Sequence, residues 1–303
     1  MPQISRSDMK INGVLLFEKP VGISSNRALQ KVRKLFKNTK AGHTGTLDPF
    51  ASGLLPICLG EATKFASFLL DSNKTYQVVG RMGWKSSTGD SEGNLTRDSL
   101  AKLPTKQVLK KNILAFKGDL SQKPPMHSAL KKNGKRLYEL VRQGKVVPRE
   151  SRNIKIFDIM ILDIDSEFFS LKVVCSKGTY IRTLITDIGD RIGYGCYVSK
   201  LERTGVSNLT LGNSVSLSKM QSLNMNERLK LVKPVDSLLS QYPKIDFDVE
   251  YTEKVRQGKD FLIKACVRAE PIIRAYGPGG LFLGIGQISN DCHFRPKRLM
   301  ATN

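Results

Sequence analysis

Apolar residues recur every three to four positions in several stretches of the chain. This spacing predicts amphipathic helices over residues 24–37, 61–70 and 105–116, because a helix turns once every 3.6 residues. The first of these opens on Ser24 and Ser25, residue types that favour a helix N-terminus. A further helical stretch is predicted around residues 226–239.

The segment KGTYIRTLITDIGDRIG is predicted to run from a strand into a helix. Thr179 is expected to cap this helix, and Gly193 stands where glycine commonly follows a helix end. The predicted buried stripe consists of Ile181, Leu184, Ile185, Ile188 and Ile192.

Alternating apolar and polar positions predict strands over residues 75–82, 154–163 and 168–175. After a linker-like stretch at 241–247, short apolar runs separated by glycine continue to the end of the chain. This pattern predicts a small all-β domain over about residues 245–303, which follows a larger domain over residues 1–240.

The charge of the chain indicates a polyanionic partner. Lys and Arg number 49 against 27 Asp and Glu, which gives a formal net charge of +22. Basic side chains bind nucleic acid by displacing the counterions of its phosphates, so RNA or DNA is the favoured partner class. The apolar run Val14–Phe17 is too short for a signal peptide, so the cytosol is the expected compartment. Five Cys without CxxC spacing predict no zinc site.

Residues 121–153 differ from the rest in composition and read as an inserted element with a basic face. Only Glu139 and Glu150 oppose the basic residues of this region. We expect the insertion to contact RNA, although a solvated charged face would have the same composition. The basic residues are Lys123, Lys131, Lys132, Lys135, Arg136, Arg142, Lys145, Arg149, Arg152 and Lys155.

The segment Gly42-His43-Thr44-Gly45-Thr46-Leu47-Asp48-Pro49 is the densest in potential chemistry. Gly42 and Gly45 permit backbone angles that other residues resist, and Pro49 disfavours the helical region at Asp48. An aspartate held in a partly dry turn is a candidate nucleophile or general base. An ordinary Asx-turn would have the same local sequence, so the segment alone leaves both interpretations open.

Longer motifs around this segment resemble the TruB-type pseudouridine synthases. The catalytic motif of that family is similar to GHTGTLDPFASGLLPICLGEATKFASFLLDSNKTY, and the spacing on to KGTYIRTLITDIG also agrees. The leading INGVLLFEKPVGISS is similar to the entry strand and turn of the family. The inserted thumb of the family resembles PPMHSALKKNGKRLYELVRQGKVVPRE.

The resemblance implies a fold and an activity. The expected fold is an α+β catalytic domain on a mixed, largely antiparallel sheet, with a thumb insertion and a small C-terminal β domain of the PUA-like kind. The expected reaction converts uridine 55 in the T-arm loop of tRNA to pseudouridine, without cofactor or metal. A monomer is the default state.

The resemblance also assigns roles to six residues. Asp48 corresponds to the catalytic aspartate, Arg182 to the arginine that pairs with it, and Tyr76 to the active-site tyrosine that stacks on the base and is a candidate for proton transfer from C5. Tyr180 and Leu201 correspond to residues that line the uridine pocket, and His43 to a residue that holds the target nucleotide out of its stack. Lys64, Lys74 and the insertion are expected to contact phosphates.

Several features leave alternatives open. The thumb has His127 and Lys132 where aromatic residues are common in the family, and Ser87 replaces a usual acidic residue. A non-catalytic RNA-folding or ribosome-assembly factor could keep the same fold and charge. A glycoside-type hydrolase using Asp48 is a weaker alternative, since no second carboxylate at the site can be identified from the sequence.

Overall fold

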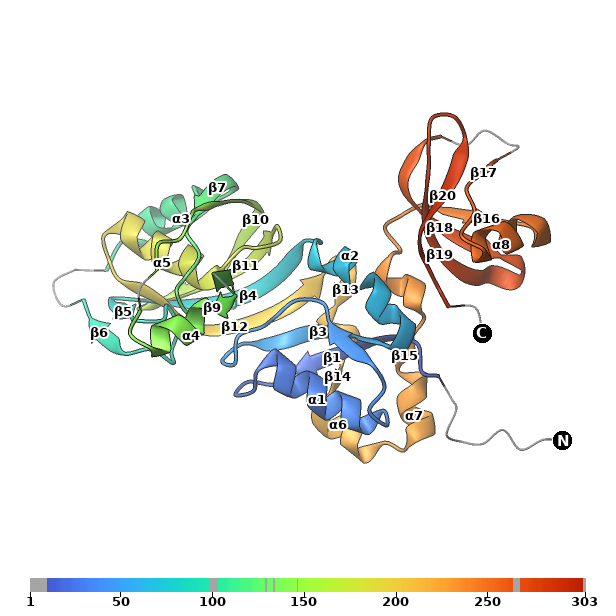
Figure 1. The fold of residues 1–303 in the computed structure, drawn as a ribbon. Coiled ribbons are helices and arrows are strands. Elements are labelled where there is room, and N and C mark those ends of the chain that lie inside the picture. Colours follow the sequence, from blue (N-terminus) through green and yellow to red (C-terminus); the bar gives the residue numbers. More distant parts are fainter. Residues whose placement is uncertain are drawn as a thin grey trace.

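The computed structural model contains a long central sheet and a separate smaller sheet at the C-terminal end of the chain (Figure 1). The central sheet is mixed but largely antiparallel: β1 pairs with β14, and β3 with β12, in parallel. The expected fold class is therefore confirmed. The structure describes residues 10–98, 103–128, 130–132, 134–145, 147–263 and 268–301.

Over the described ranges, the central sheet has eleven strands, eight of which follow one another in space. In spatial order these are β14 (Val215–Ser216), β1 (Gly13–Lys19), β3 (Ser52–Leu59), β12 (Cys196–Val206), β4 (Lys74–Met82), β11 (Phe168–Cys175), β10 (Arg152–Asp165) and β7 (Gly118–Gln122). Three short strands pair at the side of this path: β2 (Ala41–His43) with β3, β13 (Leu209–Thr210) with β12, and β15 (Val232–Lys233) with β1.

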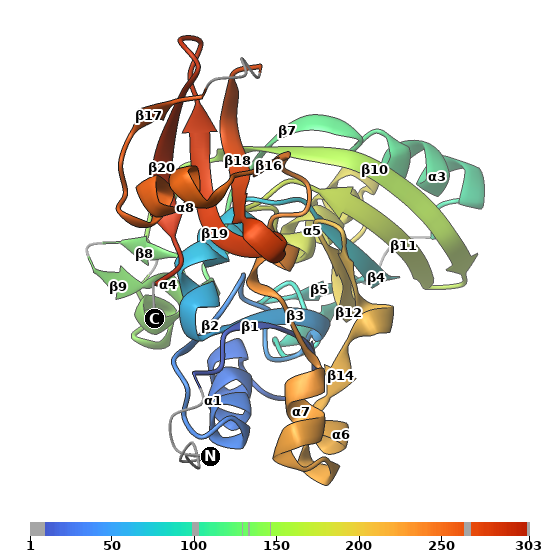
Figure 2. The same ribbon diagram turned by 90° about the vertical axis from the view of Figure 1, so that its right-hand side faces the viewer.

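Helices and two short hairpins surround the sheet (Figure 2). The helices are α1 (Ser25–Leu35), α2 (Ala66–Leu70), α3 (Lys106–Leu114), α4 (Leu137–Arg142), α5 (Ile181–Ile192), α6 (Leu217–Ser222) and α7 (Met225–Lys230). The 3-10 turns of this part are η1 (Gly60–Phe65), η2 (Leu211–Asn213) and η3 (Val235–Leu238). The hairpins are β5 (Trp84–Ser86) with β6 (Leu95–Arg97), and β8 (Lys131–Lys132) with β9 (Lys135–Arg136).

Most predicted helices are present, and their ends follow from local chemistry. The Ser24 hydroxyl caps α1 by accepting a hydrogen bond from the Arg27 backbone N–H. The expected cap of α5 was wrong by one residue: Tyr180 is the N-cap, and the Thr179 hydroxyl instead donates to the Ser176 carbonyl. The left-handed residue at the end of α5 is Gly193, as predicted.

The helix predicted over residues 226–239 was only partly correct. The chain forms α7, then the short strand β15, and after Pro234 the 3-10 turn η3. Proline has no N–H to donate and clashes with a preceding helical turn, which accounts for the break. An apolar spacing that fits one helix therefore covers three short elements here.

Apolar side chains from α3 and α5 pack on one face of β4, β10, β11 and β12. A second cluster lies between α1 and the strands β1 and β3. The two clusters fix the two ends of the central sheet on either side of the β3–β12 pairing. The loop that carries Asp48 connects β2 to β3, next to this junction.

A helix that was not predicted from the sequence packs beside the C-terminal sheet. The strand order of this sheet is β16 (Lys244–Asp246), β18 (Glu270–Gly277), β19 (Leu281–Ile288), β20 (His293–Leu299) and β17 (Phe261–Leu262). Helix α8 (Val249–Arg256) packs beside it, and η4 (Pro278–Gly280) joins β18 to β19. The prediction of an all-β segment was therefore wrong at α8, which Asp248 caps through the Tyr251 N–H.

A shared apolar cluster joins the C-terminal sheet to the central part of the chain. Ile285 belongs to the same buried cluster as Phe65 and Leu238, and the Phe65 and Phe282 rings lie 5.7 Å apart. The Tyr276 hydroxyl also donates to Asp236 at 2.7 Å. Within the described residues, no helix has the length and apolar character needed to cross a membrane.

Candidate active site

The loop that carries Asp48 is held on both sides by the start of the chain. The buried Ser25 hydroxyl accepts from the Leu47 N–H at 2.8 Å and lies 2.9 Å from the Leu47 carbonyl. On the other side, the Pro49 carbonyl accepts from the Gly22 N–H at 2.8 Å and from the Lys19 ammonium at 3.3 Å. The backbone on either side of Asp48 is thus fixed before any ligand binds.

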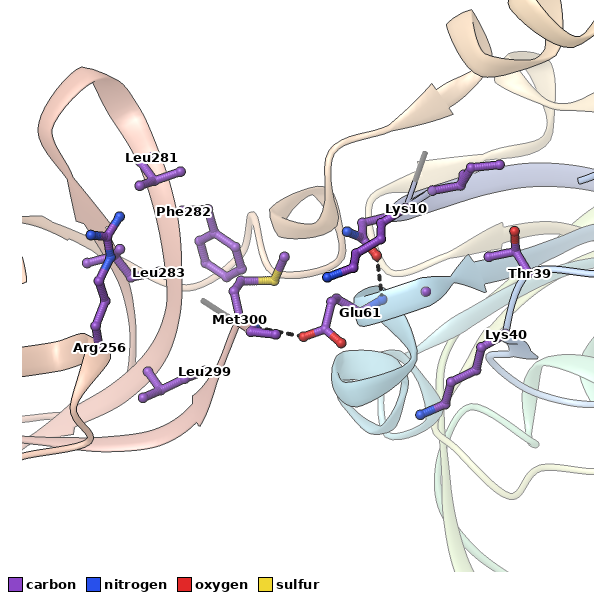
Figure 3. Close-up of a pocket in the computed structure, with 14 residues that line it drawn as sticks. Lys10, Thr39, Lys40, Glu61, Arg256, Leu281, Phe282, Leu283, Leu299 and Met300 are labelled. Carbon is purple, nitrogen blue, oxygen red and sulfur yellow. Dashed lines mark hydrogen bonds between the residues drawn. The ribbon is translucent and has the colours of Figure 1, made fainter. Parts of the chain in front are cut away.

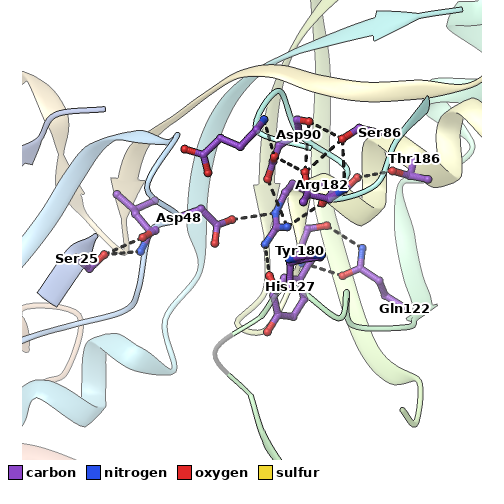
Figure 4. Close-up of polar contacts among 12 residues, drawn as sticks. Ser25, Asp48, Ser86, Asp90, Gln122, His127, Tyr180, Arg182 and Thr186 are labelled. Atoms are coloured by element: carbon purple, nitrogen blue, oxygen red, sulfur yellow. Dashed lines mark hydrogen bonds and ion pairs between the residues drawn. The ribbon is translucent and has the colours of Figure 1, made fainter. Parts of the chain in front are cut away.

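Asp48 faces a buried arginine from the first turn of α5 (Figure 4). The Arg182 Nε donates to Asp48 Oδ2 at 3.0 Å. The other guanidinium nitrogens donate to the Thr88 carbonyl at 2.8 Å and the His127 carbonyl at 2.6 Å, and an ion pair of 3.4 Å joins Arg182 to Asp90. Arg182 is 4% exposed, whereas the Asp48 side chain remains 35% exposed. Its surroundings fix the arginine, and the carboxylate stays accessible.

The protonation of Asp48 depends on opposing effects. Burial raises the pKa of its carboxyl above the ordinary value, and this outweighs the lowering by the charge and hydrogen bond of Arg182. The negative charge of Asp90 raises the pKa further. Arg182 therefore opposes the rise in pKa and favours the ionised, nucleophilic form of the carboxyl.

We predict that Asp48→Asn is at least as stable as the wild type at neutral pH. Because the folded-state pKa of Asp48 is raised, its protonated form contributes stability that is fully present below the unfolded-state pKa of about 4 and is lost as the pH rises through the folded-state pKa. Asparagine does not titrate, so the free energy of unfolding of the variant should gain on that of the wild type between about pH 4 and pH 7.

Urea unfolding at a series of pH values measures this difference. Asp158→Asn is a matched control of opposite sign, because hydrogen bonding from Lys117 lowers the pKa of the Asp158 carboxyl. Relative to the wild type, that variant should lose stability as the pH rises to about 4, and the two proteins should stay parallel above that pH, because a lowered pKa acts below the unfolded-state value. A loss for Asp48→Asn as well would contradict the assigned environment of Asp48.

A cavity of about 310 Å³ opens in front of Asp48. Tyr76 from β4, Tyr180 at the start of α5 and Leu201 from β12 line this cavity together with Asp48 and Arg182. The structure therefore brings together five of the six residues named from the sequence. Leu201 also belongs to the main apolar core, so its side chain both packs in that core and lines the cavity.

His43 lies on β2, and it is not among the residues that line the cavity. Its Nδ1 is buried and has no hydrogen-bond partner among the described residues. Burial lowers the pKa of its imidazole, and the charge of Arg203 lowers it further. Its expected contact with a displaced nucleotide stays a prediction.

Sequence reasoning missed several groups that support the site. The Gln122 amide binds the Tyr180 backbone twice, donating to its carbonyl at 3.0 Å and accepting from its N–H at 2.8 Å. Arg203, a buried cation two residues after Leu201, lies at the floor of the cavity. Its only sequence signal was a basic residue on the same face of a strand as a pocket-lining residue.

Further carboxylates lie near Asp48, contrary to the sequence reading. Asp90, 5% exposed, binds Arg182, and its Oδ1 accepts from the Thr88 hydroxyl at 2.5 Å. Burial and the negative charges of Asp90 and Asp48 raise the pKa of Glu92, so Glu92 interacts electrostatically with both carboxylates. Asp90 is occupied by an arginine and turned away from solvent, so it is poorly placed to act as a second catalytic acid.

The structure contradicts the expectation that Lys74 contacts phosphates. Lys74 is 7% exposed, and its ammonium donates to the carbonyls of Leu69, Leu70 and Ser72 at 2.6 to 3.0 Å. Lys74 therefore holds the end of α2 at one wall of the cavity. Lys64 is half-buried and pairs with Glu61.

A larger cavity, of about 590 Å³, lies elsewhere, between η1 and the C-terminal sheet (Figure 3). Phe282, Leu283 and Met300 line one side of it, and Lys10 and Lys40 line the other. It contains neither the carboxylate–arginine pair nor the tyrosines. Size alone therefore does not identify the reactive site.

Two solved structures share this architecture. A structure of an H/ACA ribonucleoprotein bound to a substrate RNA containing 2′-deoxyuridine superposes with a TM-score of 0.73 at 20% identity, covering 96% of this chain and 85% of that chain. The archaeal box H/ACA sRNP Nop10–Cbf5 complex gives a TM-score of 0.72 at 21% identity, covering 96% and 87%. The chain thus shares the fold of these two proteins.

Sequence comparisons identify the family of the chain. The TruB family pseudouridylate synthase N-terminal domain matches residues 33–181, the tRNA pseudouridylate synthase B C-terminal domain matches residues 182–240, and the C-terminal domain of pseudouridine synthase II TruB matches residues 243–300. The tRNA pseudouridine synthase B of Dechloromonas aromatica (strain RCB) is 44% identical over 98% of each chain, and that of Mannheimia succiniciproducens is 42% identical over 96% of each. The chain belongs to the TruB family of pseudouridylate synthases.

Proposed function

We propose that this chain is a tRNA pseudouridine synthase that isomerises uridine 55 in the T-arm loop, with Asp48 as its nucleophile. Full-length relatives that are named tRNA pseudouridine synthase B support the reaction and the class of RNA. The observation that carries the assignment of Asp48 is its position: a carboxylate that opens into a cavity while a buried arginine holds it.

The target base must leave its stack before Asp48 can reach it. Extruding a nucleotide from a folded loop costs a few kcal/mol of stacking and pairing. Contacts of the extruded base with the ring of Tyr76 and the apolar side chain of Leu201, which line the cavity, would offset part of this cost. His43 is proposed to hold the target nucleotide out of the loop.

The chemistry requires a nucleophile and a proton acceptor. The Asp48 carboxylate attacks the nucleotide, at C1′ of the ribose or at C6 of the uracil, and the base turns and bonds to the ribose through C5. Loss of the C5 proton, for which Tyr76 is the proposed acceptor, restores the aromatic ring. The net change is an isomerisation without redox change, so the reaction needs no cofactor.

The remainder of the molecule is proposed to hold the tRNA. Residues 1–240 would form the catalytic domain, with a thumb at about 121–153, and residues 245–303 would form a PUA-like RNA-binding domain. The net charge of +22 supports extensive phosphate contacts. A monomer suffices, since one chain supplies Asp48, Tyr76 and Arg182.

The alternative of a non-catalytic RNA-folding factor is not favoured. Such a factor needs the fold and the charge but not an arginine buried against an accessible carboxylate. Holding Arg182 in this position desolvates a cation and uses four acceptors, which is a cost without benefit to RNA binding alone.

Product mapping tests the proposed substrate. Incubation with an unmodified tRNA transcript should produce one pseudouridine, at position 55, and an isolated T-arm stem-loop should also be modified. A transcript with cytidine at position 55 is the matched control and should stay unmodified. Pseudouridine at another position would contradict the T-arm assignment, and an unmodified transcript with RNA binding intact would favour the RNA-folding factor.

A further inference from the structure

Arg203 is a cation buried beneath the active-site cavity. It is 1% exposed, and no ion pair to it is present among the described residues. Its guanidinium donates to three backbone carbonyls: Nε to Leu54 at 2.8 Å, and the other nitrogens to Thr46 at 3.4 Å and Gly45 at 3.1 Å. A buried charge of this kind is costly unless an opposite charge or strong dipoles lie near it.

The position of Arg203 follows from the register of the sheet. Arg203 on β12 stands directly opposite Tyr76 on β4, and side chains of opposed residues in antiparallel strands share one face of the sheet. A register shift between Arg203 and Gly205 bends the strand at this point. On the other side, a Cβ at Gly53 would lie 2.4 Å from the Arg203 carbonyl oxygen, so only glycine permits this approach of β3.

Donor counting leaves part of the guanidinium available. Arginine has five N–H donors, and the three carbonyls use three of them. Burial raises the pKa of the Tyr76 phenol, and the charge and hydrogen bonding of Arg203 act to lower it. Tyr76 is the side chain opposite, and it lines the cavity with Arg203.

We propose that Arg203 is a positioning residue for the proton transfer: it holds the backbone before Asp48 and its strand partner Tyr76 in fixed relation. The inference rests on the proposed function. When the base has rejoined through C5, this carbon carries both the ribose and a hydrogen, and N1 is doubly bonded to C6. The Tyr76 oxygen takes the C5 proton while its own proton passes to a water molecule. The C–H electron pair becomes the C5=C6 bond, and the N1=C6 pair moves to N1, which takes a proton from that water. The phenol and the water are thereby restored.

Single-turnover rates of pseudouridine formation test this role in the full chain. We expect Arg203→Met to slow the reaction by about 10²- to 10⁴-fold, the contribution usual for a general acid or base, with tRNA affinity within a few-fold. Arg203→Lys keeps the charge but cannot reach every acceptor, so its loss should be smaller. The matched control is Arg228→Met on α7, since Arg228 likewise donates to backbone carbonyls, those of Met220 and Leu35. Its rate should not change.

Two readouts separate this role from simple bracing of the loop. Deuterium at C5 of the target uridine should slow Arg203→Met more than it slows the wild type. Tyr76→Phe combined with Arg203→Met should be no slower than Tyr76→Phe alone, because both substitutions impair the same proton-transfer step. Losses that multiply, with an unchanged isotope effect, would overturn the proposal.

A third arm covers variants that are unstable or too slow to measure. With 3-fluorotyrosine at position 76, the phenol is more acidic, and part of the rate lost in Arg203→Lys should return. No recovery would overturn the role of Arg203. If the wild type and Arg228→Met form no pseudouridine at all, the proposed function fails instead, and the two failures are distinct.

Discussion

Asp48→Asn should abolish pseudouridine formation and leave the affinity for unmodified tRNA within a few-fold. Asparagine keeps the shape and can still accept the hydrogen bond from Arg182, but it cannot attack a carbon centre. Removing the nucleophile from enzymes of covalent mechanism costs on the order of 10⁴-fold or more in turnover. Single-turnover rates and a tRNA binding isotherm measure the two quantities on one preparation.

Asp158→Asn is the matched control, because it removes an exposed carboxylate on β10 that pairs with Lys117, away from the cavity. Its rate should equal that of the wild type. A large loss of tRNA affinity in Asp48→Asn would show that Asp48 organises the binding surface. Retained turnover would remove the nucleophile assignment altogether.

Arg182→Met should have the second largest effect, and it should reduce both stability and activity. Arg182 and Asp90 are 4% and 5% exposed, so the substitution leaves a buried carboxylate without its cation. Breaking a buried ion pair by removing one partner typically lowers the free energy of unfolding by about 3–5 kcal/mol. The carbonyls of Thr88 and His127 also lose their donors.

The pH profile should change in a defined direction. Arg182 lowers the pKa of Asp48, so its removal should raise that pKa further. Arg182→Lys keeps the positive charge but loses the fixed guanidinium hydrogen bond to Asp48, and it is expected to retain measurable activity. The acid limb of its rate profile should therefore move to higher pH. An unshifted acid limb would contradict the pairing.

Arg191→Met is the control for Arg182. Arg191 lies on the same helix α5, is exposed, and donates to the Asn112 side chain at 3.1 Å. Its removal should change the free energy of unfolding by less than about 0.5 kcal/mol and leave the rate unchanged. Equal losses in the two variants would indicate a general effect on α5.

The elements with regular spacing were predictable from the sequence. Helix α1 has a polar cap, a clear apolar stripe and packing on neighbouring strands, so local and tertiary preferences agree. Strand β12 was not predicted, because its register shifts at two places and the alternation of buried positions is broken there. Helix α8 lay in a segment whose glycines and short apolar runs indicated strands.

The candidate site was predictable where long motifs carried it. Asp48, Tyr76, Tyr180, Arg182 and Leu201 meet at one cavity, although the loop and α5 are separated by more than a hundred residues. The supporting groups were not predictable, because their roles depend on distant contacts. Arg203 bonds to carbonyls about 150 positions away, and the burial of Lys74 against the end of α2 has no signature in the chain.

The most direct test is tritium release from unmodified tRNA labelled with [5-³H]uridine, with the wild type beside Asp48→Asn. Moving the glycosidic bond to C5 displaces the hydrogen of that carbon into water. The wild type should release tritium to the extent of one uridine per tRNA, and Asp48→Asn should release none while it still binds. Equal release by both proteins, or none by the wild type, would contradict the claim that Asp48 carries out this isomerisation.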